Sequence, residues 1–131
     1  MEHHKKEFTY KGMNLEELKK LDTREFAKYL RARQRRTTLR NFQEIEKFVS
    51  RVKEKQGKGK KIKTHKRDIV IVPQLVGTTI QVYNGRDFIQ FEITGEMLGH
   101  KLGEFAPTRQ RIAHTKSGVG ATKGSKHKSK K

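Results

Sequence analysis

Residues 78–93 read TTIQVYNGRDFIQFEI, and this stretch decides the fold. An Asn-Gly pair interrupts two segments in which apolar and polar side chains alternate, which predicts a β-hairpin. A two-residue turn would place Val82 across from Asp87, whereas a four-residue NGRD loop pairs Val82 with Ile89. We favour the four-residue loop because cross-strand apolar pairs stabilise a hairpin. Both registers direct the same apolar side chains to one face: Ile80, Val82, Ile89, Phe91 and Ile93.

A second apolar run precedes the hairpin. Residues 69–72 read IVIV and stop at Pro73, which predicts a short buried strand. Together with the hairpin, this run predicts a sheet of three strands.

The N-terminal part of the chain has the pattern of helices. Within residues 14–55, three Asn or Asp residues are each followed by Glu three positions later, which is typical of helix starts. These residues are Asn14, Asp22 and Asn41. An apolar stripe follows Asn41 at helical spacing, and we expect it to pack against the domain or a partner helix.

The sequence therefore predicts an α+β fold, with a small, mostly antiparallel three-stranded sheet packed with helices. We expect an N-terminal helical extension over residues 1–55 and a basic linker over 56–67. The α+β core would span 68–114, and a basic, flexible C-terminal tail would span 115–131.

The composition points to a polyanionic partner. The 131-residue chain carries 32 Lys and Arg against 14 Asp and Glu, a formal net charge of +18, and is only 31% hydrophobic. Residues 68–108 contain two basic and five acidic side chains, whereas residues 1–67 contain 22 basic and nine acidic ones. A near-neutral middle with cationic flanks is typical of a compact core whose extensions bind a polyanion such as nucleic acid.

Other function classes are disfavoured. The chain has no cysteine, and its six histidines are scattered without metal-binding spacing. No apolar run approaches the roughly 20 residues that span a bilayer. We expect no metal, no cofactor and no membrane association.

Two basic segments are candidate nucleic-acid contacts. Residues 31–40, RARQRRTTLR, would present arginines in several directions around a turn, where guanidinium groups contact phosphates and stack on bases. Residues 56–67 would be a flexible linker that becomes ordered on its partner. The candidate contacts are Arg31, Arg33, Arg35, Arg36, Arg40, Lys60, Lys61, Lys63, His65, Lys66 and Arg67.

The stretch GHKLGEFAPTRQR, residues 99–111, allows two interpretations. His100 and Glu104 could act as base and acid, but glycines weaken a helix here and no metal motif or phosphate-binding loop accompanies them. We favour a structural role in which Glu104 holds Arg109, Arg111 or backbone N–H groups. In that case, Gly99 and Gly103 would permit tight turns, and Phe105 would cover the end of the sheet.

The segment NGRDFIQFEITGEMLGHKLGEFAPTR resembles the S-nineteen family of small-subunit ribosomal proteins. The residues that carry the resemblance are Asn84, Gly85, Gly99, Leu102, Gly103, Glu104, Phe105 and Thr108. The stretches FTYKGMNLEEL, ARQRR and GVGAT are similar to the longer archaeal and eukaryotic type of this family.

This resemblance implies a cytoplasmic, ribosomal, non-enzymatic protein in the head of the small subunit. It would bind the 3′ major domain of the rRNA beside the S-thirteen protein, near the large subunit, with its tail directed towards the decoding region and A-site tRNA. Further expected rRNA contacts are Asn84, Gly85, Arg86, His100, Lys101, Arg109, Arg111 and His114. Expected tail contacts are Lys116, Lys123 and Lys126. The alternative is a generic DNA-packaging or RNA-chaperone protein.

Overall fold

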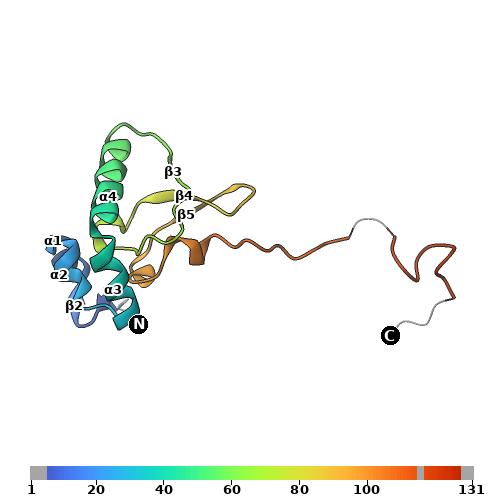
Figure 1. Cartoon of the computed structure of the whole chain (residues 1–131), viewed down its shortest axis with the longest axis horizontal. Helices are drawn as coiled ribbons and strands as arrows, with labels where there is room; N and C mark the ends of the chain where they lie inside the picture. The colour runs from blue at the N-terminus through green and yellow to red at the C-terminus, as the bar shows by residue number, and fades with distance from the viewer. Residues whose placement is uncertain (1–5, 115–116, 128–131) are drawn as a thin grey trace, which may run out of the picture.

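The computed structural model describes residues 6–114 and 117–127 (Figure 1). Its N-terminal half contains a small antiparallel pair of strands followed by four helices: β1 (Thr9–Tyr10), β2 (Met13–Asn14), α1 (Leu15–Lys20), α2 (Thr23–Ala27), α3 (Ala32–Arg40) and α4 (Phe42–Gly57). The remainder contains a three-stranded sheet and three 3₁₀ turns: β3 (Ile62–Thr64), η1 (Pro73–Leu75), β4 (Thr79–Tyr83), β5 (Phe88–Glu92), η2 (Gly95–Met97) and η3 (Leu102–Phe105). The α+β class is confirmed.

Two of the three predicted helix starts form capping boxes. The backbone N–H of Asn14 donates to Glu17 at 3.3 Å, and that of Asp22 donates to Glu25 at 3.2 Å. Asn41 instead lies between α3 and α4 without a side-chain cap hydrogen bond. The predicted helix start is nevertheless confirmed, because α4 begins at Phe42 with Asn41 as its N-cap residue.

The hairpin has the predicted four-residue loop. Val82 pairs with Ile89 and Ile80 pairs with Phe91, as cross-strand apolar packing requires. Ile80, Val82 and Ile93 are buried on the core side. The register predicted from the alternating pattern is therefore confirmed.

The third strand was predicted in the wrong place. β3 lies inside the segment expected to be a flexible linker and pairs parallel with β4, so the sheet is mixed rather than mostly antiparallel. Ile62 and Thr64 are buried while Lys63 between them is exposed, and this short alternation is hidden by the surrounding lysines.

Residues 69–72 are extended and buried, but they do not join the sheet. Their backbone hydrogen-bonds to residues 99–102: the N–H of Ile71 donates to the carbonyl of His100 at 2.8 Å, and that of Leu102 donates to Ile69 at 3.0 Å. A continuous apolar run fits burial on all sides, and here the partner is an irregular segment rather than a strand.

The core lies between α4 and the sheet. The buried part of the apolar stripe of α4 is at most 4% exposed and belongs to the same cluster as the inward side chains of β3 and β4. This confirms that the stripe packs against the domain. Its buried members are Ile45, Phe48, Val49 and Val52, whereas Phe42, with which the predicted stripe begins, is half-buried.

One arginine connects three distant parts of the chain. The Arg67 guanidinium donates to the carbonyl of Tyr83 at 2.7 Å and to those of Gly103 and Ala106 at 2.8 and 2.7 Å. The N–H of Gly103 donates back to the carbonyl of Arg67 at 2.9 Å. We call these four bonds the Arg67 clamp. They join the end of β4 to η3 and to the chain leaving β3, an internal role that sequence reasoning missed.

Replacing Arg67 with Lys should weaken the clamp, because an ammonium cannot donate in the guanidinium's fork geometry to three separate carbonyls. We expect Arg67→Lys to lower the free energy of unfolding by about 2 kcal/mol, measured by urea denaturation. The matched control is Arg86→Lys on the exposed loop, which should change it by less than about 0.5 kcal/mol. Equal effects of the two changes would contradict the clamp.

Gly103 allows the close approach on which the clamp depends. A Cβ added there would lie 2.9 Å from the Cβ of Arg67 and 3.0 Å from its carbonyl oxygen. Gly103→Ala should therefore cost about 1–3 kcal/mol of unfolding free energy. Gly57→Ala is the control, because the new methyl would meet nothing within 4 Å at the end of α4. It should be neutral or stabilising, and a destabilisation of both variants would contradict the packing argument.

Candidate nucleic-acid interface

The arginines of residues 31–40 lie on a helix rather than around the predicted turn. α3 begins after Arg31 and places Arg33, Arg36 and Arg40 on one side, because positions three and four apart share a helical face. With Thr37 and Asn41 they line a shallow hollow of about 320 Å³. All three arginines are exposed. We call Arg33, Arg36 and Arg40 the arginine face.

Arg35 on the same helix has a different role. Its guanidinium donates to the carbonyls of Ala27, Lys28 and Leu30 at 3.0–3.2 Å. These carbonyls lie at and just after the end of α2, where helix carbonyls lack intrahelical partners and a cation is favoured. Arg35 therefore holds α2 and α3 together, although the sequence predicted an RNA contact.

Arg31 lies just before α3 and is exposed. Burial raises the pKa of Tyr10, and the positive charge of Arg31 partly opposes that rise. Tyr10 also packs against Phe26, with the ring centroids 5.9 Å apart. Arg31 thus lies close to the junction between the small N-terminal strand pair and the helices.

The lysines of the expected linker lie on and beside the edge strand β3. Lys60, Lys61 and Lys63 are exposed, and lysines are common on edge strands because they oppose strand-to-strand association. Lys66 forms an ion pair with Glu44 of α4 at 3.2 Å. This pair ties the chain after β3 to α4.

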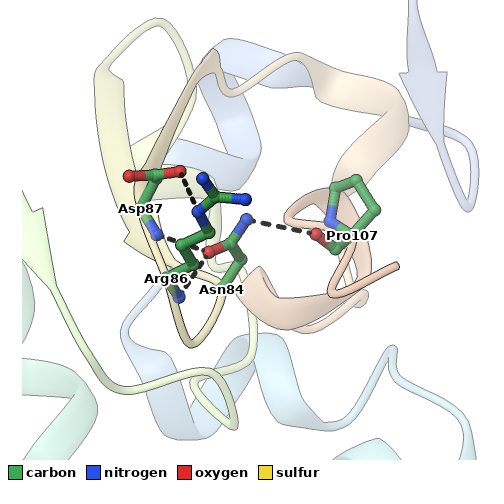
Figure 2. Close-up of polar contacts among 4 residues, drawn as sticks. All are labelled: Asn84, Arg86, Asp87 and Pro107. Carbon is green, nitrogen blue, oxygen red and sulfur yellow. Dashed lines mark hydrogen bonds and ion pairs between the residues drawn. The ribbon is translucent and has the colours of Figure 1, made fainter. Parts of the chain in front are cut away.

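The hairpin loop is organised by Asn84 (Figure 2). Its side-chain oxygen accepts the backbone N–H groups of Arg86 at 2.9 Å and of Asp87 at 2.7 Å. Its amide nitrogen donates to the carbonyl of Pro107 at 3.4 Å. Gly85 adopts a φ of +100°, which the turn requires. Asn84 and Gly85, expected to contact RNA, therefore shape the loop that exposes Arg86.

Glu104 contacts the backbone and a histidine rather than the two arginines considered from the sequence. Its Oε2 lies 2.6 Å from Nδ1 of His100, and its Oε1 accepts the N–H of Lys101 at 3.3 Å. The side chains of His100 and Glu104 are both about half exposed. The pair closes the turn that leads into η3.

The two other structural candidates near Glu104 pack closely. At Gly99, whose φ is +79°, an added Cβ would lie 3.0 Å from Leu30. The Phe105 ring lies 5.6 Å from that of Phe91 and 5.9 Å from that of His100. Gly99 and Phe105 thus bring the C-terminal part of the domain against the helices and the sheet.

The start of the tail leads away from the body of the domain (Figure 1). Arg109, Arg111 and His114 are exposed along it. Lys123 and Lys126 are also exposed, whereas Lys116 lies outside the described residues. The structure thus brings the arginine face together on one helix but leaves the tail residues spread along the chain.

Sequence reasoning missed two aromatic residues that flank the loop. Tyr83 and Phe88 pair across the hairpin and are half-buried. The alternation that directs Ile80 and Val82 to the core directs Tyr83 to the opposite face, so the pattern contained the signal.

Two other kinds of site are absent from the described part of the chain. Within residues 6–114 and 117–127, no group of three or more His, Asp or Glu side chains could hold a metal ion. In the same ranges, no helix is long and apolar enough to cross a membrane.

The fold and its exposed basic surfaces are those of a small, basic α+β protein whose charge suits a polyanionic partner. The family described as "Ribosomal protein S19" matches residues 31–114. A curated relative, the small ribosomal subunit protein uS19 of Methanocella arvoryzae, is 48% identical over 124 residues, covering 94% of this chain and 86% of the relative. The chain therefore belongs to the ribosomal protein S19 family, which confirms the resemblance and supports the expected non-enzymatic role.

The position of Glu104 makes its role testable. Glu104→Gln removes the charge beside His100 but keeps an oxygen that can accept the N–H of Lys101. Because both side chains of the pair are half exposed, we expect the free energy of unfolding to fall by at most about 1 kcal/mol.

Glu92→Gln, at an exposed carboxylate on β5, is the control and should have no measurable effect. Both proteins should also be incubated with RNA. An RNA-cleaving activity that disappears in Glu104→Gln would overturn the structural role and favour the catalytic one.

Proposed function

We propose that the chain is a structural constituent of the small ribosomal subunit that acts by binding rRNA. Membership of the ribosomal protein S19 family supports the ribosomal role, as does the name of the Methanocella relative. The observation that carries the rRNA contact is the arginine face. Its three exposed guanidinium groups line one hollow on a single helix, where forked donors can bind phosphates from one stretch of backbone.

The mechanism is scaffolding by a rigid domain with basic extensions. The Arg35 contacts hold α3 against the end of α2, and the Arg67 clamp holds the end of β4 against η3. Basic groups held on a rigid domain can bring separate rRNA segments together with little loss of conformational entropy on binding. The exposed tail instead loses conformational entropy when it binds its partner.

The finer placement follows from the family resemblance. The protein would lie in the subunit head on the 3′ major domain of the rRNA, beside the S-thirteen protein and near the large subunit. The tail would extend towards the decoding region and A-site tRNA. The exposed course of residues 107–114 away from the domain supports a reach of this kind.

The alternative is a generic DNA-packaging or RNA-chaperone protein, since a net charge of +18 alone attracts any polyanion. Co-sedimentation with small subunits at high salt separates the two functions. A subunit constituent stays bound through many cooperating contacts, whereas a generic binder washes off.

The arginine face can be tested by neutralisation. The triple variant Arg33→Gln, Arg36→Gln, Arg40→Gln should weaken binding to small-subunit rRNA. It should also reduce the slope of log K against log salt by about 0.7–0.9 for each phosphate that is no longer neutralised. Filter binding at several salt concentrations measures both quantities.

The control is Lys19→Gln, Lys20→Gln, Lys28→Gln, which removes the same formal charge from exposed positions on and beside α1 and α2. It should have the smaller effect on affinity and slope. Equal reductions in the two triple variants would show that net charge, and not the arginine face, governs binding.

A further inference from the structure

The sheet has a second face that lies opposite the core. On β4, Ile80 and Val82 are buried in the core, so Gln81 and Tyr83 point the other way. The strand registers place Phe88 and Gln90 of β5 beside them on one side and Lys63 on the other. His65 follows β3 on the same side, in contact with Tyr83. We call this set the outward face: Lys63, His65, Gln81, Tyr83, Phe88 and Gln90.

Three aromatic rings gather at the loop end of the outward face. The centroids of His65 and Tyr83 are 4.7 Å apart, and Phe88 lies 5.1 Å from each of them. The rings are inclined to one another by 51–78°, so none covers another by parallel stacking. His65 is exposed, and the other two are half-buried.

Positive charge lies on the same face as the rings. The ammonium of Lys63 lies 5.1 Å from the ring centroid of Phe88. At the other end of the outward face, Lys60 and Lys61 line a hollow of about 220 Å³ together with Gln81 and Gln90. The side chain of Gln81 donates a hydrogen bond to that of Gln90 at 2.8 Å, and the pair lies between the hollow and the rings.

The acidic groups nearby do not cancel this charge. Asp87 lies in the loop within 3.8 Å of the Arg86 guanidinium, and Glu92 is at the far end of β5 opposite Thr79. Asp87 offsets the charge of Arg86, so the positive charge of the outward face comes from Lys63 beside the rings and from Lys60 and Lys61 further along.

We propose that the outward face is a stacking site for unpaired nucleotides of the rRNA, with His65, Tyr83 and Phe88 contacting bases. Lys60, Lys61 and Lys63 contact the adjoining phosphates. This inference rests on the proposed function and names residues and a contact mode that the arginine face does not supply. Aromatic side chains beside a basic groove are the recurring means of holding single-stranded nucleic acid, because every base offers a π-face.

A purely structural role accounts for only part of this arrangement. A cross-strand Tyr83–Phe88 pair stabilises the end of a hairpin without needing an exposed histidine or a lysine over the ring. A protein partner is also a poorer match, because lysines are depleted from the centres of protein–protein interfaces. Charge complementarity favours an RNA strand.

The test uses Tyr83→Leu, Phe88→Leu and His65→Gln in the full chain, with small-subunit rRNA as the probe. Each variant should bind about 5- to 160-fold more weakly, which corresponds to the loss of one base-stacking side chain. The slope of log K against log salt should stay unchanged, because the same phosphates are still neutralised. Lys63→Gln should instead reduce that slope by about 0.7–0.9.

Phe91→Leu is the matched control, because it makes the same change on the core-facing side of β5. Circular dichroism and urea denaturation check that each variant is folded. Because His65 is exposed, His65→Gln remains informative if the two leucine variants are destabilised. With 4-thiouridine in the rRNA, photocrosslinks should map to the peptides that contain His65, Tyr83 or Phe88.

Three results would overturn the stacking site. If all three variants bind rRNA with unchanged affinity while the arginine-face variant binds more weakly, the stacking site is ruled out and the proposed function stands. Reduced incorporation into small subunits with unchanged affinity for free rRNA would assign the outward face to a neighbouring protein. If the unmodified chain does not bind rRNA, the proposed function fails together with the stacking site.

Discussion

The arrangement of this domain depends on one interaction, the Arg67 clamp. A guanidinium has five N–H donors in a fixed plane, and here it satisfies carbonyls that lie 16, 36 and 39 residues further along the chain. These carbonyls belong to the last residue of β4, to η3 and to the residue just after η3, and the guanidinium supplies a hydrogen-bond donor to each of them. The cation therefore joins the sheet to η3, and Gly103 makes its approach possible.

This constraint divides the basic residues into two groups. Arg35, Lys66 and Arg67 are engaged with carbonyls or a carboxylate of the domain, and they hold helices, strands and turns in position. The arginine face and the tail have their charges directed to solvent. The chain has a net charge of +18. A cation that binds backbone carbonyls stabilises the fold without a carboxylate partner. Such contacts therefore add no negative charge that would offset the positive charge exposed to solvent.

The sequence predicted the elements that follow from a periodic pattern of apolar residues, but not the contacts between residues that are far apart in the chain. The alternation around the Asn-Gly turn is long enough to specify the register of β4 and β5. β3 has only three residues among lysines, so its pattern is too short to recognise. α3 lacks an apolar stripe, with Thr38 buried and Leu39 exposed, so its sequence predicts a turn instead of a helix. The contacts of Arg35 and Arg67 join positions whose proximity only the fold determines.

The two proposed RNA-binding surfaces, the arginine face and the outward face, would contribute differently to one interaction. Guanidinium groups on α3 act through charge, which attracts RNA over about 10 Å at ordinary ionic strength but does not distinguish one backbone from another. Aromatic rings act only on contact and require an unpaired base, which a continuous duplex does not offer. Because the Arg67 clamp binds the carbonyl of Tyr83 itself, this ring is carried by a strand end that is fixed to η3. Charge would then raise the rate of association and the affinity, while the rings would select sites where the rRNA is unpaired.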